Sequence, residues 1–141
     1  MLFRSSALRL YGEARQMAPD SWEANFNLGY LHLRLAHLSE AERYLRQAIA
    51  ITPNNPDQYF FLVGALLQSG RLDEAEAIAR QSLRRWPRTR GFHHALALVL
   101  EKKGRLEEAR DALRAELAIE STKEVQNDLA ELEKAIAAGR R

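Results

Sequence analysis

Four histidines are the side chains of this sequence best suited to metal binding or acid–base chemistry. His93 and His94 are adjacent, so on a helix their side chains point about 100° apart and do not form the i, i+4 pair that shares an ion. His32 and His37 are five residues apart, with a helix end predicted between them. None of the four stands at a recognisable ligand spacing from a carboxylate. The sequence therefore predicts no metal site and no cofactor.

The sequence also lacks the motifs of the common enzyme classes. It contains no cysteine, which excludes thiolate catalysis, disulfides and cysteine-based zinc sites. It contains no G-x-S-x-G, no P-loop and no G-x-G-x-x-G. Acidic pairs such as Asp73-Glu74 fall on predicted solvent faces, where they favour helix N-termini. We therefore expect no catalytic residues and no enzymatic activity.

The strongest electrostatic feature is the arginine cluster, which consists of Arg84, Arg85, Arg88 and Arg90 and surrounds Trp86. Such a cluster could hold phosphates and stack a base. Alternatively, the arginines complement a helix C-terminus while Trp86 covers the junction between two helix pairs. The net charge of +2, from 21 basic and 19 acidic residues, gives little reason to expect nucleic acid as the main ligand. Nucleic-acid contact stays the weaker alternative.

The composition indicates one folded, soluble domain. The 141 residues are 46% hydrophobic and 28% charged, which is too apolar for disorder. No apolar run approaches the 18 or so residues that a membrane span needs, so no insertion into a membrane is expected. The first nine residues are basic and amphipathic, as in a transit peptide, yet they also fit the repeat described next. Absent cysteine and a composition rich in Ala and Arg favour a cytoplasmic location and a bacterial source.

An internal repeat of 34 residues determines where these side chains lie. Several residue types recur with this one period, each as a separate ladder along the chain. The ladders are Ala7, Ala41, Ala75 and Ala109; Pro19, Pro53 and Pro87; Leu28, Leu62 and Leu96; and Leu38, Leu72 and Leu106. Agreement among independent ladders indicates a repeat protein.

Each repeat reads as a pair of antiparallel helices. A small residue at Gly29 allows a second helix to approach the first closely. Gly70 and Gly104 follow the first helix of their units, where a positive φ ends a helix at least cost. Pro53 and Pro87 lie beyond the second helix and prevent its continuation.

This pattern resembles the tetratricopeptide repeat (TPR) family. The matching residues recur in three successive units and, in part, before them. They are Ala7, Tyr11, Ala14 and Pro19; then Leu28, Gly29, Ala41, Ala48, Ile49 and Pro53; then Tyr59, Leu62, Gly70, Leu72, Ala75, Leu83 and Pro87; then Leu96, Ala97, Gly104, Leu106, Ala109 and Leu117, with Ser121 in place of the last proline. The resemblance implies an all-α fold, a right-handed α-solenoid of antiparallel helix hairpins with about eight helices.

The repeat divides the chain into five segments of a single TPR domain, 1–141. Residues 1–21 form an N-terminal half-repeat or capping helix. Three full units cover 22–55, 56–89 and 90–123, and a C-terminal capping helix covers 124–138. The first segment is either a native cap or the remainder of a longer array.

Both end segments carry helix signals of their own. Ser121 and Glu124 have the spacing of a capping box, with the serine as N-cap. An apolar stripe then follows along the last helix, and another runs along the first helix and is expected to pack on the next repeat. The stripes are Val125, Leu129, Leu132 and Ile136 in the last helix, and Phe3, Ala7, Leu10, Ala14 and Met17 in the first.

The resemblance also implies a role and a binding surface. The family's concave groove would make the chain a protein–protein interaction module, an adaptor or scaffold that binds an apolar or amphipathic peptide or helix. Aromatic and aliphatic side chains at the positions facing this groove would supply most of the contacts. The predicted groove residues are Phe26, Tyr30, Leu33, Arg34, Phe60, Leu67, His94 and Leu98.

Alternatives to this groove remain open. Aromatic residues at the positions of Phe26 and Phe60 are common in the family for packing alone. The carboxylate-binding residues of some members are missing, because only Asn27 matches and Asp57 and Phe61 replace the expected basic residues. The chain would otherwise be a self-associating structural unit, a homo-oligomer, or the TPR part of a larger multidomain protein.

Overall fold

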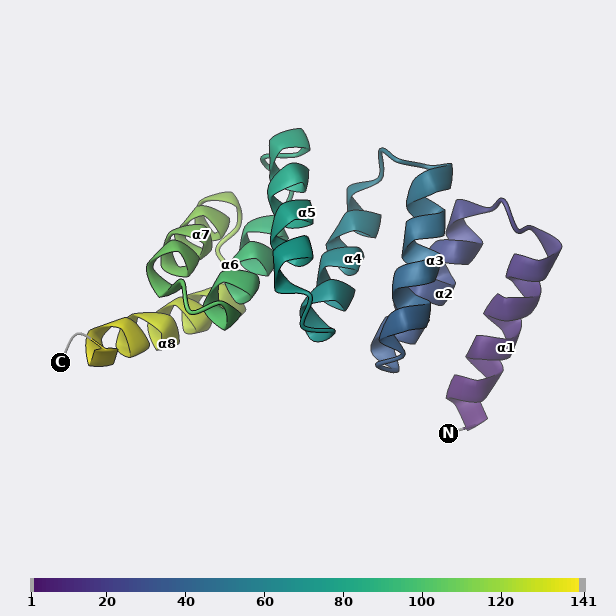
Figure 1. Cartoon of the computed structure of the whole chain (residues 1–141), viewed down its shortest axis with the longest axis horizontal. Coiled ribbons are helices and arrows are strands. Elements are labelled where there is room, and N and C mark those ends of the chain that lie inside the picture. The colour runs from purple at the N-terminus through teal and green to yellow at the C-terminus, as the bar shows by residue number, and fades with distance from the viewer. Residues whose placement is uncertain (1, 140–141) are drawn as a thin grey trace. The chain divides into compact units, whose positions relative to one another are not determined.

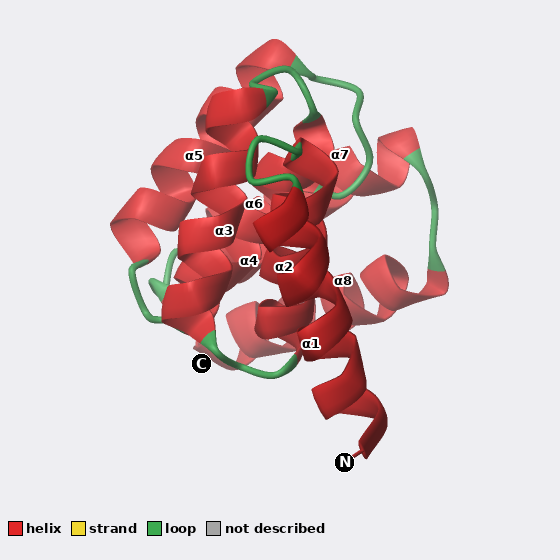
Figure 2. Ribbon diagram, turned by 90° about the vertical axis from the view of Figure 1, so that its right-hand side faces the viewer, coloured by secondary structure: helices red, strands yellow, loops and turns green. Residues whose placement is uncertain are grey.

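The computed structural model of the protein describes residues 2–139, which form eight α-helices and no strand (Figures 1 and 2). The predicted all-α class is therefore confirmed. The chain divides into two compact units, one ending at Gly70 and the other beginning at Arg71. Each unit consists of a central helix hairpin with a further helix on either side. Among the described residues, none of these helices has both the length and the apolar character needed to cross a membrane.

The first unit is built around the hairpin of α2 and α3. Its helices are α1 (Leu2–Met17), α2 (Trp22–Arg34), α3 (Leu38–Ile51) and α4 (Pro56–Gln68). Helix α1 packs against α2, and α4 packs against both α2 and α3. Leu28, Leu45 and Leu62 are almost completely buried at these contacts. The apolar ladder of the sequence thus forms the core of this unit, as periodicity of this kind predicts.

Gly29 lies at a close contact between α2 and α3. A Cβ atom added to it would lie 2.7 Å from the Cγ of Leu45 and 3.2 Å from the Leu45 backbone nitrogen. This confirms the prediction that a small residue here lets the second helix come near. It also shows that no larger side chain fits without movement of α3.

The second unit is built around the hairpin of α6 and α7. Its helices are α5 (Leu72–Arg85), α6 (Phe92–Lys102), α7 (Leu106–Ile119) and α8 (Lys123–Gly139). Helix α5 packs against α6, and α8 packs against α7. Phe92 and Val99 from α6 are completely buried, and Leu113 from α7 is nearly so. On α8, Val125, Leu132 and Ile136 are buried and Leu129 is half-buried, so the predicted stripe of this helix faces the unit.

Positive φ occurs in the turns that follow α2, α4 and α6. Gly70 and Gly104 both have φ +78°, which confirms the prediction for these glycines. Ala36 occupies the equivalent position one repeat earlier and adopts φ +60°. This conformation costs a residue with a Cβ roughly 1 kcal/mol or more. The neighbouring His37 N–H donates to the His32 carbonyl at 2.9 Å, which closes α2 despite this cost.

The first helix of each repeat in the first unit is tied to the turn before it. The Asn25 side chain donates from Nδ2 to the carbonyl oxygens of Pro19 and Ser21, at 3.1 and 2.9 Å. The Gln58 amide donates to the Thr52 carbonyl at 3.0 Å, and both Asn25 and Gln58 are completely buried. These bonds give partners to the amide nitrogens of two completely buried side chains.

The capping of α8 differs from the sequence prediction. Helix α8 begins at Lys123, and the Thr122 hydroxyl accepts from the Val125 N–H at 3.3 Å. Thr122 is therefore the N-cap, and the predicted capping box of Ser121 and Glu124 is wrong. The Ser121 hydroxyl instead accepts from the Gln126 side chain at 2.7 Å. Two adjacent hydroxyls compete for one cap, and the helix start decides which of them reaches the free N–H groups.

Helix α1 presents a different face from the one predicted. Leu10 and Met17 are 57% and 88% exposed, and Ala14 between them is exposed as well. The half-buried face instead carries Arg15, whose Nη2 donates to Gln47 Oε1 at 3.3 Å and whose guanidinium lies 5.7 Å from the Tyr44 ring centroid. The aliphatic stem of an arginine can cover apolar surface while its charged end finds polar partners. Of the stripe expected to pack on the next repeat, Ala7 is half-buried and Leu10, Ala14 and Met17 face solvent. Phe3 lies outside the side chains that the structure describes.

Candidate functional site

An aromatic cluster in the first unit brings three of the predicted groove residues together. Phe61 of α4 lies at its centre, with ring centroids 5.6 Å from Phe26, 5.1 Å from Tyr30 and 5.3 Å from Phe60. All three pairs have the edge-to-face geometry that aromatic rings prefer. Trp22 extends the cluster, with its centroid 6.3 Å from that of Phe26. Helices α2 and α4 thus jointly form an aromatic surface.

Phe61 belongs to this site although it was not among the predicted groove residues. The resemblance to the family assigned to this position only a basic residue, which Phe61 replaces. The consecutive aromatics Tyr59, Phe60 and Phe61 were the available signal, since three adjacent side chains on a helix cannot all face one core. In the structure, Tyr59 points towards the loop before α4, where its hydroxyl donates to the Pro53 carbonyl at 2.8 Å.

Tyr30 is the exposed end of the aromatic cluster. It is 37% exposed, and its hydroxyl accepts from Nη1 of Arg34 at 3.0 Å. The Arg34 guanidinium also lies 5.8 Å from the Tyr30 ring centroid, within the range of a cation–π contact. The predicted residues Tyr30 and Arg34 therefore form one polar and aromatic rim, one helical turn apart on α2.

The two predicted leucines of the first unit are half-buried. Leu33 on α2 approaches α4, because a Cβ added to Gly64 would meet its Cδ2 at 3.7 Å. Leu67 lies one turn beyond Gly64 on α4. With Arg34 and the three predicted aromatic residues, these leucines make six predicted groove residues that lie on α2 and α4 of one compact unit.

The remaining two predicted groove residues, His94 and Leu98, lie on α6 of the second unit. Leu98 is 37% exposed. His94 is 17% exposed, and its Nε2 lies 2.7 Å from Oδ2 of Asp128 on α8. His94 therefore pairs with a carboxylate that does not stand at a recognisable ligand spacing from it in the sequence. The available signal was the repeat itself, because Asp128 follows His94 by 34 residues.

The backbone around His94 is fixed by a buried carboxylate. Glu116 of α7 is 2% exposed and accepts from the Gly91 N–H at 2.6 Å and from the His94 N–H at 3.3 Å. Gly91 itself has φ +103° and no side chain with which to cap α6. Glu116 therefore supplies from another helix the acceptor that an N-cap residue normally provides.

The structure also brings His32 and His37 together across the turn at Ala36. Their Nδ1 atoms lie 3.2 Å apart, and the His32 ring stacks on Tyr44 with centroids 5.5 Å apart. Burial is the main reason why the pKa of His32 lies below its ordinary value, and the nearby His37 lowers it further. The sequence predicted a helix end between the two histidines but gave no sign of their contact.

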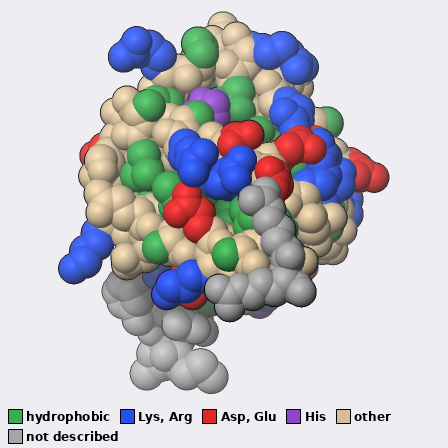
Figure 3. Space-filling model, turned by 90° about the vertical axis from the view of Figure 1, so that its left-hand side faces the viewer, with side chains coloured by type: hydrophobic (Ala, Val, Ile, Leu, Met, Phe, Trp, Pro, Cys, Tyr) green, Lys and Arg blue, Asp and Glu red, His purple; other side chains and the backbone are tan. Residues whose placement is uncertain are grey.

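The arginine cluster engages neighbouring side chains of its own unit. The Arg85 guanidinium lies 4.2 Å from the Trp86 ring centroid, and Arg90 pairs with Glu120 at 2.5 Å. Trp86 stacks on the buried Phe92, with centroids 6.3 Å apart. These contacts agree with the packing interpretation of Trp86. Basic and acidic side chains also lie next to one another on the face drawn in Figure 3.

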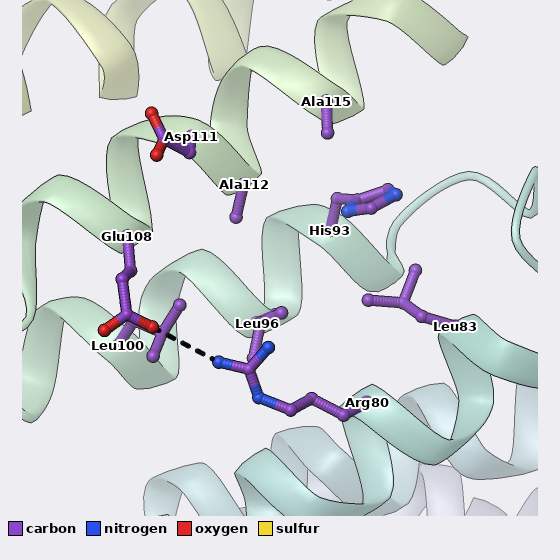
Figure 4. Close-up of a pocket in the computed structure, with 9 residues that line it drawn as sticks. All are labelled: Arg80, Leu83, His93, Leu96, Leu100, Glu108, Asp111, Ala112 and Ala115. Atoms are coloured by element: carbon purple, nitrogen blue, oxygen red, sulfur yellow. Dashed lines mark hydrogen bonds and ion pairs between the residues drawn. The ribbon is translucent and has the colours of Figure 1, made fainter.

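A hollow of about 340 Å³ lies between α5, α6 and α7 of the second unit (Figure 4). Its apolar lining comes mainly from Leu83, Leu96 and Leu100. An ion pair at 3.4 Å between Arg80 and Glu108 lies along one side. No sequence signal pointed to this hollow, because it results from the packing of three successive helices and not from a motif.

Comparisons with known proteins agree with this architecture. A family model described as tetratricopeptide repeat matches residues 5–59 and 38–88. A thermophilic TPR protein of Thermus thermophilus superposes with a TM-score of 0.81 at 27% identity, over 94% of this chain and 74% of that one. MamA of Desulfovibrio magneticus superposes with a TM-score of 0.82 at 15% identity, over 95% and 76% of the two chains, and so shows the fold alone.

An O-GlcNAc transferase of Thermobaculum terrenum is similar over a smaller part. Its TM-score is 0.67 at 26% identity, over 79% of this chain but only 22% of that one. No curated protein sequence matches the chain. The structural neighbours confirm the predicted α-solenoid class.

Proposed function

Because this chain belongs to the tetratricopeptide repeat family, we propose that it is a protein–protein interaction module whose first unit binds an apolar or amphipathic peptide or helix. The TPR fold suggests an interaction or scaffold role. The proposal adds the surface and the kind of ligand. It also treats residues 22–55, 56–89 and 90–123 as the repeat units, and residues 1–21 and 124–138 as end segments of one TPR domain.

The aromatic cluster around Phe61 is the observation that carries this proposal. Packing of rings against one another explains Phe26 and Phe60, which are half-buried. It does not explain Tyr30, which keeps over a third of its surface in water. Partly exposed aromatic side chains held in a rigid arrangement are typical anchors of interfaces, since they bury much area at little cost in entropy.

Arg34 adds polar specificity to this surface. Its guanidinium is held by the Tyr30 hydroxyl and ring, so it is positioned before a ligand arrives. A prepositioned arginine at the rim favours a segment that carries a carboxylate or a free backbone carbonyl next to its apolar residues. The expected ligand is therefore an apolar segment with an acidic flank.

The test compares two double variants of the same unit. Peptides selected from a random displayed library against the whole chain are measured by fluorescence anisotropy. Tyr30→Ala/Leu67→Ala is expected to weaken binding at least about thirtyfold, as loss of two anchor side chains does. Tyr11→Ala/Ile51→Ala is the control, because both side chains are apolar and 39% exposed but lie on α1 and α3.

The control variant distinguishes peptide binding at this surface from nonspecific binding to exposed apolar side chains. Equal loss in both double variants, or unchanged affinity of a well-folded Tyr30→Ala/Leu67→Ala chain, would contradict the proposed surface. His94 and Leu98 stay separate predictions for the second unit. Their replacement by alanine in the same assay tests them independently.

A second candidate function is self-association, which the exposed face of α1 favours. Leu10, Tyr11 and Met17 expose large apolar surface on this one helix. Soluble monomers rarely leave a large contiguous apolar patch in water. If the function is self-association, light scattering should give a mass that rises with concentration, and Leu10→Glu/Met17→Glu should restore the mass of a single 16.1 kDa chain. A constant monomeric mass argues against it.

A further inference from the structure

The cluster formed by His94, Glu124 and Asp128 gathers three metal-ligand side chains in the second unit. Their ligand atoms all lie within 4.8 Å of one another. Glu124 and Asp128 are four residues apart on α8, so they share one face of that helix. His94 comes from α6, and its Nε2 is 2.7 Å from the Asp128 carboxylate. Two helices thus direct one imidazole and two carboxylates to one point.

Packing fixes the backbone that carries His94 and Glu124. The His94 backbone is fixed by Glu116, which accepts its N–H together with that of Gly91. On α8, Val125 is 4% exposed and lies directly after Glu124 in the chain. Buried side chains beside a ligand-bearing residue restrict the directions in which the ligand can point, which preorganises a site.

We propose that His94, Glu124 and Asp128 bind a divalent transition-metal ion, with Zn²⁺ as the best match. Imidazole nitrogen and carboxylate oxygen are both ordinary Zn²⁺ ligands, at about 2.0–2.2 Å. An imidazole ligand disfavours Mg²⁺ and Ca²⁺, which take oxygen ligands. Three protein ligands leave the fourth tetrahedral position to water.

The geometry needs only a small adjustment to accept the ion. Ligand atoms of a tetrahedral Zn²⁺ are about 3.3 Å apart, given the usual bond lengths. The contact between His94 and Asp128 therefore opens by about 0.6 Å as the ion replaces the shared proton. Glu124 is exposed, so its side chain is free to turn inward from the present separation of up to 4.8 Å.

A purely structural hydrogen bond between His94 and Asp128 is the competing explanation. That bond needs two residues only and does not involve Glu124. The Glu124 carboxylate consequently separates the two explanations. Its exposure also means that its replacement should leave the fold intact.

The experiment is a calorimetric titration of the full chain with ZnCl₂. All variants carry His37→Ala, because the His32 and His37 nitrogens 3.2 Å apart could hold a second ion. In this background we expect one equivalent of Zn²⁺ to bind and to raise the Tm. Glu124→Gln and His94→Ala should each weaken binding at least tenfold, while His93→Ala, the adjacent histidine, should leave the affinity unchanged.

Two outcomes would overturn the proposal. One is the absence of binding up to about 1 mM free Zn²⁺ in the His37→Ala background. The other is binding that Glu124→Gln does not weaken, since that result places the ion elsewhere. Circular dichroism of each variant confirms that the chain is folded, and Glu124→Gln keeps the test decisive if His94→Ala does not fold.

Discussion

At the scale of single residues, two glycines that both lie inside helices have opposite consequences. Gly29 and Gly64 both lie inside helices, α2 and α4, where glycine costs about 0.5–1 kcal/mol relative to alanine. An added Cβ at Gly29 would overlap Leu45 at 2.7 Å, whereas at Gly64 it would make an ordinary contact with Leu33 at 3.7 Å. Of these two glycines, packing therefore requires only Gly29.

We predict that Gly29→Ala destabilises the chain and that Gly64→Ala stabilises it. The overlap at Leu45 costs about 1–3 kcal/mol, which exceeds the gain in helix propensity and leaves a net loss of about 1 kcal/mol. Gly64→Ala should gain up to about 1 kcal/mol. Urea unfolding followed by circular dichroism measures both. A stabilised Gly29→Ala chain would show that α3 moves away at little cost.

Single residues also show which features of the fold the sequence can predict. Gly29 was predictable because a close approach of two helices excludes larger side chains. Gly70 and Gly104 were predictable because a positive φ favours glycine. Ala36 was not, since it adopts the same turn against its own preference. The cap at Thr122 was missed for a related reason. Two neighbouring hydroxyls carry the same sequence signal, and only the exact start of α8 distinguishes them.

At the scale of helices, Glu76 links α5 to the turn between α6 and α7. Its carboxylate accepts from Lys103 at 2.7 Å, from Arg105 at 2.8 Å and from Arg80 at 2.8 Å. The hydrogen bond from Lys103 is the largest cause that lowers the Glu76 pKa from 4.5 to about 2, followed by that from Arg80. Three cations around one largely buried carboxylate stabilise its ionised form in the folded chain.

We predict that this link weakens in acid. Because the folded pKa is depressed, the stabilisation is fully present above the unfolded value of about 4.5 and is lost as the pH falls towards 2. Glu76→Gln should cost about 1–2 kcal/mol at pH 7, allowing for the solvent exposure of the arginines, and much less near pH 2.5. Unfolding free energies at the two pH values measure the difference.

Glu74→Gln on the same helix is the matched control. Glu74 pairs with Arg71 at 2.7 Å, and both side chains are well exposed. Exposed pairs contribute about 1 kcal/mol or less, so this variant should show a smaller pH-dependent loss. A loss for Glu76→Gln that is equal at pH 7 and pH 2.5 would contradict the assigned role of its charge.

Helix faces were harder to predict than helix positions. The ladders identified all the hairpin helices, because buried alanines and leucines recur where the helices cross. The face of α1 depended on which side chains its neighbours could receive, and Arg15 took the place expected of an apolar residue. The aromatic cluster was predicted through Phe26, Tyr30 and Phe60 but lacked Phe61, whose packing depends on α2 and α4 together.

At the scale of the whole molecule, the 34-residue period contains more information than the local motifs. It predicted the all-α class and the family. It also relates His94 to Asp128, although spacing within one helix gave no sign of that pair. Two side chains that lie one full repeat apart in the sequence can meet in a repeat protein. Motifs with short spacings within one helix do not reveal such pairs.

The division into two compact units has a spectroscopic consequence. The chain has two tryptophans, and each unit contains one of them, Trp22 in the first and Trp86 in the second. Both lie beside phenylalanine rings, so their fluorescence responds to loss of local packing. The single-tryptophan chains Trp22→Phe and Trp86→Phe each report on one unit alone. Coincident or separate melting curves from these two chains reveal whether the units unfold as one cooperative body or one after the other.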